Sequence, residues 1–160
     1  SWGWAQNAPF RRYKSWAHEG GIATPCIAWW PGRVPQGTIT REVGHIIDFL
    51  PTFLELAGAG YPEKHNGYAI LPVEGKSLVK VLRGGIREGH KQLAWEWSGN
   101  RALREGRWKV VWDKLDKRWA LFDLEADRTE MNDLGHINAA LAKRLAGDWG
   151  EWAKRTGLRR

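Results

Sequence analysis

The sequence predicts a folded chain of the α/β class, in which a buried strand and a helix precede a small antiparallel sheet packed by a C-terminal helix. Three observations support this prediction. Hydrophobic residues fill 42% of the 160 positions, and 12 residues are Trp, which is typical of a chain with a core. Apolar residues recur at helical spacing near residue 50 and again towards the C-terminus. Between them, stretches rich in Trp, Val and Leu alternate with turn residues, as strands do.

The N-terminal segment predicts a loop followed by a strand. Residues 1–20 are polar, aromatic and rich in turn formers, so we expect a loop with one short helical turn at 13–18. Residues 22–30 form a nearly continuous apolar run that ends at Pro31-Gly32. Such a run predicts a strand buried on both faces, and Pro25 indicates that the strand lies near an edge or starts there.

A helix is predicted from residue 48 to residue 57. Asp48 is the expected N-cap, Pro51 falls in the first turn, and Gly58 provides the stop. The broad apolar face of this helix predicts that it packs against another element.

Glycine and proline recur between residues 59 and 91, which predicts a loop-rich connection with at most a short helix at 77–82. We expect a domain boundary in this connection. Residues 92–97, 102–112 and 119–124 then predict an antiparallel meander. A final amphipathic helix is predicted from apolar residues at helical intervals, ending at Gly157; these are Leu134, Ile137, Leu141, Leu145, Trp149 and Trp152.

Charge and cysteine content limit the function classes. The net charge is +7 and the sequence pI is about 9.8, which favours anionic partners, although the basic residues are scattered instead of forming one stripe. The single cysteine, Cys26, excludes an intrachain disulfide. The five His residues are spread singly, which argues against a metal site formed by this chain alone.

Five motifs in one order resemble the sulfatases of the arylsulfatase type. Residues 10–32 contain a lysine, Lys14, a Glu-Gly-Gly turn and a Trp-Pro-Gly stop. An Asp-x-x-Pro-Thr helix follows at 48–58, and a Gly-x-Ser-Leu segment at 75–78. Residues 101–111 resemble the Arg-x-Gly-x-Trp-Lys strand pair, and residues 121–134 resemble the closing Leu-Tyr-Asp-Leu and Glu-x-x-Asn-Leu run.

This resemblance implies an α/β fold like that of alkaline phosphatase, of which the chain is the C-terminal part. Residues 1–90 would then end the catalytic domain, including its main sheet, and residues 91–160 would form a small C-terminal α+β subdomain. It also implies hydrolysis of sulfate esters by a formylglycine beside Ca²⁺. Cys26 does not start the Cys-x-Pro-x-Arg motif of that nucleophile, so we expect both groups, and every metal ligand, outside this chain. The residues leave the compartment open, and the resemblance implies a periplasmic, secreted or lysosomal enzyme.

Two site residues follow from the resemblance. Lys14 matches the lysine that contacts the substrate sulfate, where an ammonium stabilises the charge that shifts during transfer. His18 lies four positions later and would line the substrate mouth if the turn is helical. Glu19 is expected to bind backbone groups around the glycine turn.

Two other functions remain open from the residues alone. The chain resembles a basic, Trp-rich binding module for nucleic acid or sulfated polysaccharide, which salt would weaken strongly. It also fits an inactive structural fragment that self-associates through an exposed core where the missing N-terminal part of the enzyme should sit. No segment is long and apolar enough to span a membrane.

Overall fold

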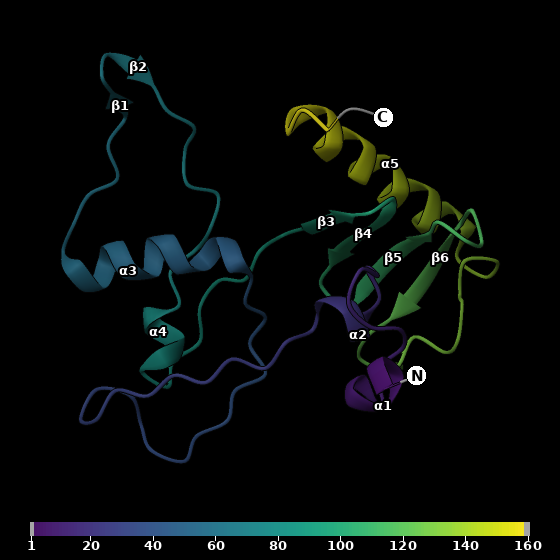
Figure 1. The fold of residues 1–160 in the computed structure, drawn as a ribbon, viewed down its shortest axis with the longest axis horizontal. Coiled ribbons are helices and arrows are strands. Elements are labelled where there is room, and N and C mark those ends of the chain that lie inside the picture. The colour runs from purple at the N-terminus through teal and green to yellow at the C-terminus, as the bar shows by residue number, and fades with distance from the viewer. Residues whose placement is uncertain (1, 159–160) are drawn as a thin grey trace. The chain divides into compact units, whose positions relative to one another are not determined.

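The structure is a computed structural model that describes residues 2–158. The chain forms two compact units, Ser1–Pro25 together with Lys91–Arg160, and Cys26–His90 (Figure 1). The N-terminal segment therefore packs with the C-terminal part of the chain. The division of a complete enzyme at residue 90 stays a prediction.

The first unit is built on a four-stranded antiparallel meander in the order β3-β4-β5-β6. Its strands are β3 (Leu93–Trp97), β4 (Asn100–Glu105), β5 (Trp108–Asp113) and β6 (Arg118–Asp123). The predicted meander is confirmed, with one difference in strand number. Residues 102–112, expected from composition as one stretch, form two strands, in agreement with the resemblance of residues 101–111 to a strand pair. Gly106 adopts a left-handed φ of 57° and Glu105 pairs with Trp108 across the turn.

Helix α5 (Ala139–Arg155) covers one face of this sheet, as predicted. Its buried residues join one core cluster with alternate residues of the strands: Leu103, Val110, Leu121, Leu145, Trp149 and Ala153. The helix starts at residue 139 instead of 134. Leu134 lies before it because its N–H donates to the carbonyl of Leu121 on β6 (2.8 Å), which ties this segment to the sheet.

The opposite face of the sheet is covered by the N-terminal segment. The other core cluster contains Ala17 together with the buried residues Ala102, Val111, Phe122 and Leu124. Side chains alternate between the two faces of a strand, so Val110 faces α5 and its neighbours Lys109 and Val111 face the N-terminal segment. The sheet is thus buried on both sides. The sequence predicted the helix on one face but not the loop on the other.

The strand predicted at 22–30 is not formed. Residues 23–30 make no ladder, and Ile27 is 92% exposed. A strand needs a neighbour for its backbone hydrogen bonds, and no strand in the described part of the chain lies beside this run. The helical turn expected at 13–18 is also not formed. The N-terminal helices are instead α1 (Trp2–Asn7) and the short α2 (Glu19–Ile22).

The second unit contains η1 (Ile46–Asp48), α3 (Phe49–Ala57), a hairpin of β1 (Lys64–His65) and β2 (Tyr68–Ala69), and α4 (Val79–Leu82). Helices α3 and α4 confirm the two predicted there. Gly58 ends α3 with a φ of 62°, which favours glycine. The hairpin was not predicted. It turns at Asn66-Gly67, where both residues have positive φ. The Asn-Gly pair is a known sequence signal for a hairpin turn and could have predicted it.

Asp48 acts differently from the predicted cap. Its side chain makes no capping bond to α3 and is completely buried. It accepts from the backbone N–H of His45 (2.9 Å) and of Lys76 (2.8 Å), and it pairs with Arg87 (2.8 Å) and His90 (2.7 Å). The carboxylate therefore joins α3 to the segment that leads to α4.

Two of the motifs meet at this point. The Thr52 hydroxyl accepts the N–H of Leu78 at 2.8 Å. A Cβ atom at Gly75 would lie 1.9 Å from the carbonyl oxygen of Ile47, so only glycine allows this approach. The Asp-x-x-Pro-Thr helix and the Gly-x-Ser-Leu segment are thus two sides of one packing contact.

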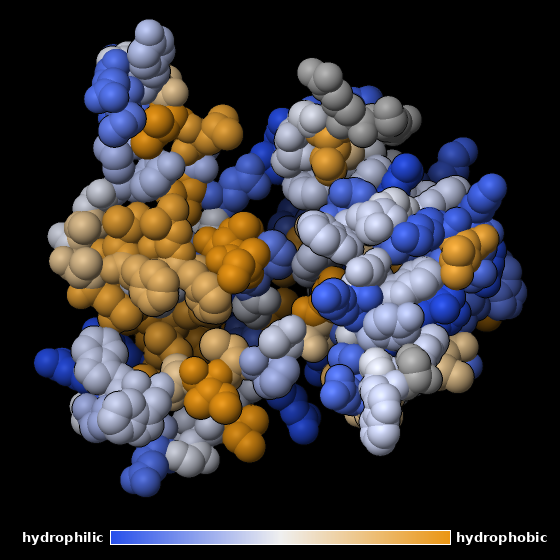
Figure 2. Space-filling view, viewed as in Figure 1, coloured by the Kyte–Doolittle hydropathy of each residue, from blue (hydrophilic) through white to orange (hydrophobic). Residues whose placement is uncertain are grey.

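Helix α3 leaves an apolar surface uncovered. Phe53 is 63% exposed, and Figure 2 shows hydrophobic side chains gathered over this helix. We define the α3 face as this exposed set: Ile46, Ile47, Phe49, Leu50, Phe53 and Leu56. In the described residues Thr52 is the one buried member of α3, so this helix packs little within its own unit.

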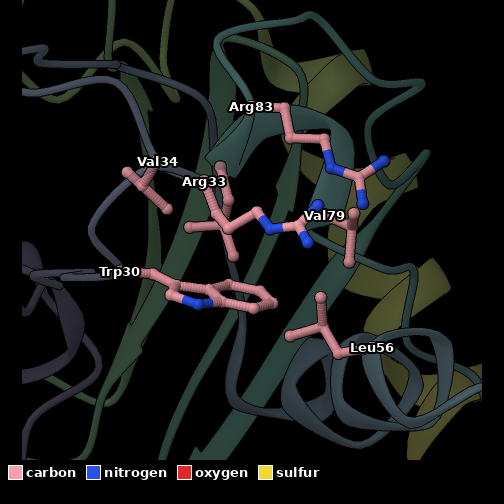
Figure 3. Close-up of a pocket in the computed structure, with 7 residues that line it drawn as sticks. Trp30, Arg33, Val34, Leu56, Val79 and Arg83 are labelled. Atoms are coloured by element: carbon pink, nitrogen blue, oxygen red, sulfur yellow. The ribbon is translucent and has the colours of Figure 1, made fainter.

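The second unit also contains a small pocket. It is lined by Trp30, Arg33, Val34, Leu56, Val79, Leu82 and Arg83. Figure 3 shows the Arg33 guanidinium beside the Trp30 indole, 6.0 Å from the ring centroid.

No helix in residues 2–158 has the length and apolarity needed to cross a membrane.

Candidate functional site

The lysine loop, defined as residues 10–21, carries Lys14 on the surface of the first unit. Lys14 is exposed, and no hydrogen bond or ion pair involves its ammonium group within residues 2–158. Its neighbours Arg12 (φ 68°) and Ser15 (φ 80°) adopt left-handed backbone conformations, which are uncommon for residues other than glycine. The loop thus turns sharply on both sides of a cation that has no partner in the described part of the chain.

The two glycines after this turn let the loop fold against itself. The Gly20 N–H donates to the carbonyl of Arg11 at 3.0 Å. A Cβ atom at Gly20 would lie 2.3 Å from the carbonyl oxygen of Arg12, and one at Gly21 would lie 2.0 Å from that of Trp16. Real Cβ atoms do not approach oxygen so closely, so both positions require glycine. This contact explains the Glu-Gly-Gly part of the motif.

Arg12, two residues before Lys14, fixes the loop to β5. Its guanidinium pairs with Asp113 at 2.7 Å and lies over the Trp16 ring, 4.2 Å from the centroid. The Arg12 guanidinium and the Trp16 ring are both partly withdrawn from water. Partial burial strengthens a cation–π contact relative to an exposed one. Burial opposes ionisation of Asp113, but the Leu115 N–H and Arg12 outweigh it, so the pKa of Asp113 is lowered.

Two further hydrogen bonds hold the loop backbone. The Asn100 side chain on β4 donates to the Ser15 carbonyl at 2.7 Å. Arg11 donates to the backbone carbonyl of Glu130, which follows β6, at 2.9 Å. These contacts reach the loop at residues 11, 12 and 15. Lys14 is therefore the exposed member of a loop whose neighbouring residues are anchored to the sheet.

A buried charged cluster lies beneath the end of the loop. Lys109 is 0% exposed, and its Nζ lies 2.8 Å from Glu19 and 2.9 Å from Glu130. Glu130 also accepts the backbone N–H of Glu19 at 2.7 Å. Arg128, which is exposed, pairs with the second oxygen of Glu19 at 3.1 Å. Two carboxylates and two cations thus compensate one another, as buried charges must.

The two carboxyl groups of the cluster differ electrostatically. Burial opposes ionisation of Glu19, but Lys109 and Arg128 outweigh it, so the pKa of Glu19 is lowered. Burial raises the pKa of Glu130, and Lys109 only partly opposes this effect. The cations thus favour the ionised form of Glu19, whereas burial favours the neutral form of Glu130. The expected role of Glu19, binding backbone groups at the glycine turn, is replaced by a pairing of side chains.

His18 lies under the loop instead of at its surface. It is 2% exposed and packs against Phe122 on β6, with 6.3 Å between ring centroids. Burial and the nearby charges of Lys109 and Arg11 lower its pKa to about 3, so the ring is neutral at physiological pH. Its Nδ1 has no hydrogen-bond partner among the described residues. Because no helical turn joins residues 14 and 18, the i, i+4 relationship expected for His18 is not formed.

The residues that hold the site together were missed by sequence reasoning. Lys109 and Glu130 lie inside quoted motifs, but nothing in the sequence pairs them with Glu19. One signal was available: Lys109 shares a strand face with Val111 while Val110 occupies the other face, and a lysine on a strand that is apolar on both faces is expected to have a charged partner. Asp113 and Asn100 carry no such signal, because both lie at strand ends.

The described residues do not fit the metal or the nucleophile of a formylglycine-dependent sulfatase. Within residues 2–158 no group of three His, Cys, Asp or Glu is arranged to hold a metal ion. Cys26 is free and exposed, in the sequence Cys-Ile-Ala-Trp-Trp. Within these residues the candidate site consists of Lys14 and the groups that anchor its loop.

The sequence matches the family described as N-sulphoglucosamine sulphohydrolase, C-terminal, over residues 10–146. An uncharacterised sulfatase of Schizosaccharomyces pombe is 30% identical over 164 residues, which cover 98% of this chain and 29% of that protein. The N-acetylgalactosamine-6-sulfatase of Canis lupus familiaris is 38% identical over 79 residues, covering 49% of this chain and 14% of its own length. The chain thus spans less than a third of these relatives.

Solved structures agree with this similarity. The crystal structure of Ps i-CgsB is 26% identical and superposes with a TM-score of 0.70 over 92% of this chain and 32% of that one. A 2-O GAG sulfatase, BT1596, gives a TM-score of 0.54 at 22% identity, over 69% of this chain and 25% of its own. The predicted fold class, the C-terminal part of an alkaline-phosphatase-like sulfatase, is confirmed by these neighbours.

Proposed function

Since this chain belongs to the N-sulphoglucosamine sulphohydrolase C-terminal family, we propose that the protein containing it hydrolyses sulfate esters and that Lys14 binds the substrate sulfate. The observation that carries this proposal is the state of Lys14. It is an exposed ammonium without an ion-pair partner in the described residues, on a loop whose neighbouring residues are anchored.

The geometry suits the chemistry. A sulfuryl group in transfer carries negative charge on its oxygens, and a fixed ammonium stabilises charge that shifts towards them. Fixed donors act better than mobile ones because they need no reorganisation during the reaction. An unpaired lysine on a mobile surface loop would lack this property. Here Arg12 and Ser15, on either side of Lys14, are tied to the sheet at 2.7 Å each.

The substrate we propose is a sulfated carbohydrate. The description of the family names a sulphohydrolase that acts on N-sulphoglucosamine. Relatives include an N-acetylgalactosamine-6-sulfatase of Canis lupus familiaris. An ulvan-active sulfatase of Formosa agariphila is 33% identical over 93 residues. The net charge of +7 favours such an anionic substrate.

The remaining catalytic parts are proposed to lie in the rest of the enzyme. A formylglycine nucleophile and Ca²⁺ would be supplied there, since the described residues of this chain fit neither. The same part would cover the α3 face and pair with the run at 23–30. The apolar side chains of both are exposed among the described residues. By itself the chain is proposed to be inactive.

His18 is proposed to support the loop. Its burial against Phe122 counts against direct contact with substrate, and its neutral ring adds no charge beside Lys14. A role in lining the substrate mouth, expected from the sequence, would require the ring to become exposed in the complete enzyme.

The test compares Lys14→Ala with Cys26→Ser in the full-length enzyme, using an aryl sulfate as substrate. We expect Lys14→Ala to lower turnover about a hundred- to a thousand-fold. Cys26→Ser changes an exposed residue outside the lysine loop and should lower turnover far less. Equal losses from both variants would refute the role of Lys14, whereas hydrolysis of the aryl sulfate by the purified 160-residue chain would refute its proposed inactivity.

A further inference from the structure

The lysine loop meets the sheet through residues that come from three separate motifs. Glu19 follows Lys14 on the loop, Lys109 lies on β5, and Glu130 follows β6. They are separated by up to 111 positions, the span between Glu19 and Glu130, yet they form one buried cluster. Nothing in the proposed chemistry requires a buried lysine at this place, because the sulfate is met by Lys14.

The cluster holds Glu19 by both its backbone and its side chain. The backbone N–H donates to Glu130 at 2.7 Å, and the carboxylate meets Lys109 at 2.8 Å. Lys109 is therefore the centre of the cluster, because it contacts both carboxylates from a strand in the middle of the sheet. Fixing Glu19 also fixes the glycine turn that follows it.

The position of Lys14 depends on that turn. Gly20 donates to Arg11, and the tight approach of Gly20 and Gly21 to the backbone of Arg12 and Trp16 leaves no room for adjustment. The loop is thus closed at its base, five residues after Lys14, by groups that Lys109 holds. A shift of Glu19 would be transmitted through this closed backbone to the residues on both sides of Lys14.

We propose that Lys109 is a positioning residue, which fixes the lysine loop on the C-terminal sheet so that Lys14 meets the sulfate in one geometry. The C-terminal sheet then acts in catalysis as the support of a distant cation, besides packing α5. This inference rests on the proposed role of Lys14. It assigns to Lys109 no contact with substrate, since its side chain is completely buried.

A double-mutant cycle in the full-length enzyme tests the proposal. The variants are Lys14→Ala, Lys109→Met and the pair together, assayed with an aryl sulfate well below their unfolding temperatures. We expect Lys109→Met to lower kcat/KM by about a hundred-fold, the loss caused by a misplacement near 1 Å. In the Lys14→Ala background the same change should have almost no further effect, because Lys109 acts through Lys14.

Val110→Ala provides the matched control. Val110 is the next residue on β5 and is equally buried, but it packs in the cluster on the α5 side. This variant should lower the unfolding temperature and leave kcat/KM unchanged. If Lys109→Met does not fold, Glu130→Gln takes its place in the same cycle, since glutamine keeps an oxygen that accepts the Glu19 N–H while removing the charge beside Lys109.

The outcomes separate this inference from the proposed function. If Lys14→Ala lowers kcat/KM and the loss from Lys109→Met multiplies with it, the positioning role is refuted and the sulfate-binding role stands. If Val110→Ala lowers kcat/KM as much as Lys109→Met does, the effect is one of stability and the inference also fails. If Lys14→Ala has no effect on kcat/KM, both proposals fail together.

Discussion

The Nζ atom of Lys109 lies 2.8 Å from Oε1 of Glu19, across 90 residues of sequence. This pair joins the middle of a sheet to the loop that covers it. Both groups are withdrawn from water, so each depends on the other for compensation of its charge. The pair also explains why a lysine is found at an inward-facing position of β5.

Removing the ammonium group should therefore destabilise the first unit strongly. Lys109→Met leaves Glu19 and Glu130 close together without the cation between them. We expect a loss of about 3 to 5 kcal/mol in the free energy of unfolding, measured by urea denaturation followed by Trp fluorescence. Arg118→Gln removes a partner of Asp133 from an exposed pair and should cost less than about 1 kcal/mol. Similar losses from both variants would contradict the buried pairing.

Two glycines offer a contrast in the same chain. Gly21→Ala would place its Cβ atom 2.0 Å from the Trp16 carbonyl oxygen, whereas Gly147 in α5 has open space around its Cβ position. We expect Gly21→Ala to destabilise by about 1 to 3 kcal/mol through overpacking. Gly147→Ala should stabilise by about 0.5 to 1 kcal/mol, because alanine is favoured within helices. Calorimetric unfolding temperatures would show shifts of opposite sign, and shifts of the same sign would contradict the described loop packing.

Acid should destabilise the fold through His18. Its pKa is lowered from 6.5 to about 3 by burial, so the unfolded chain takes up a proton in a pH range where the folded chain does not. Stability then falls as the pH falls below 6.5, by up to about 1.4 kcal/mol per pH unit.

His18→Gln should flatten this dependence. The comparison is best made between pH 6.5 and 5, above the range in which ordinary carboxylates titrate; Glu130, whose pKa is raised by burial, is present in both proteins. The pKa of His45 is lowered mainly by burial and contributes with the same sign, but it does so equally in both proteins. Urea denaturation at each pH measures the slopes, and equal slopes for the two proteins would show that His18 is not buried as described.

The α3 face should drive self-association of the isolated chain. It exposes a set of apolar side chains that includes Phe53 and Leu50, and a patch of this kind marks an interaction surface. We expect sedimentation velocity to show oligomers or aggregates that diminish in Phe53→Ser. A matched change at Leu115, which is exposed in the first unit, should have no effect. A monomeric wild-type chain would contradict the expectation.

Much of the fold could be predicted because its signals are local. The spacing of apolar residues identified α3 and α5, and turn residues between Trp- and Val-rich stretches identified the meander. Gly58 ended α3 as expected, since a left-handed C-terminal residue favours glycine. The strand expected at 22–30 failed for a physical reason. An apolar run has the composition of a strand, but pairing needs a neighbour that this chain does not provide within its described residues.

The sequence by itself determined which segments form helices and strands in most of the chain, the family, and the candidate cation, Lys14. Each of these follows from patterns in neighbouring residues of the sequence. Only the tertiary structure decided that Glu19, Lys109 and Glu130 share one buried cluster and that His18 lies beneath the loop. Charge compensation in a core depends on distances between residues far apart in the chain. Local sequence patterns give no information about such distances, so the residues that support the site could be identified only from the tertiary structure.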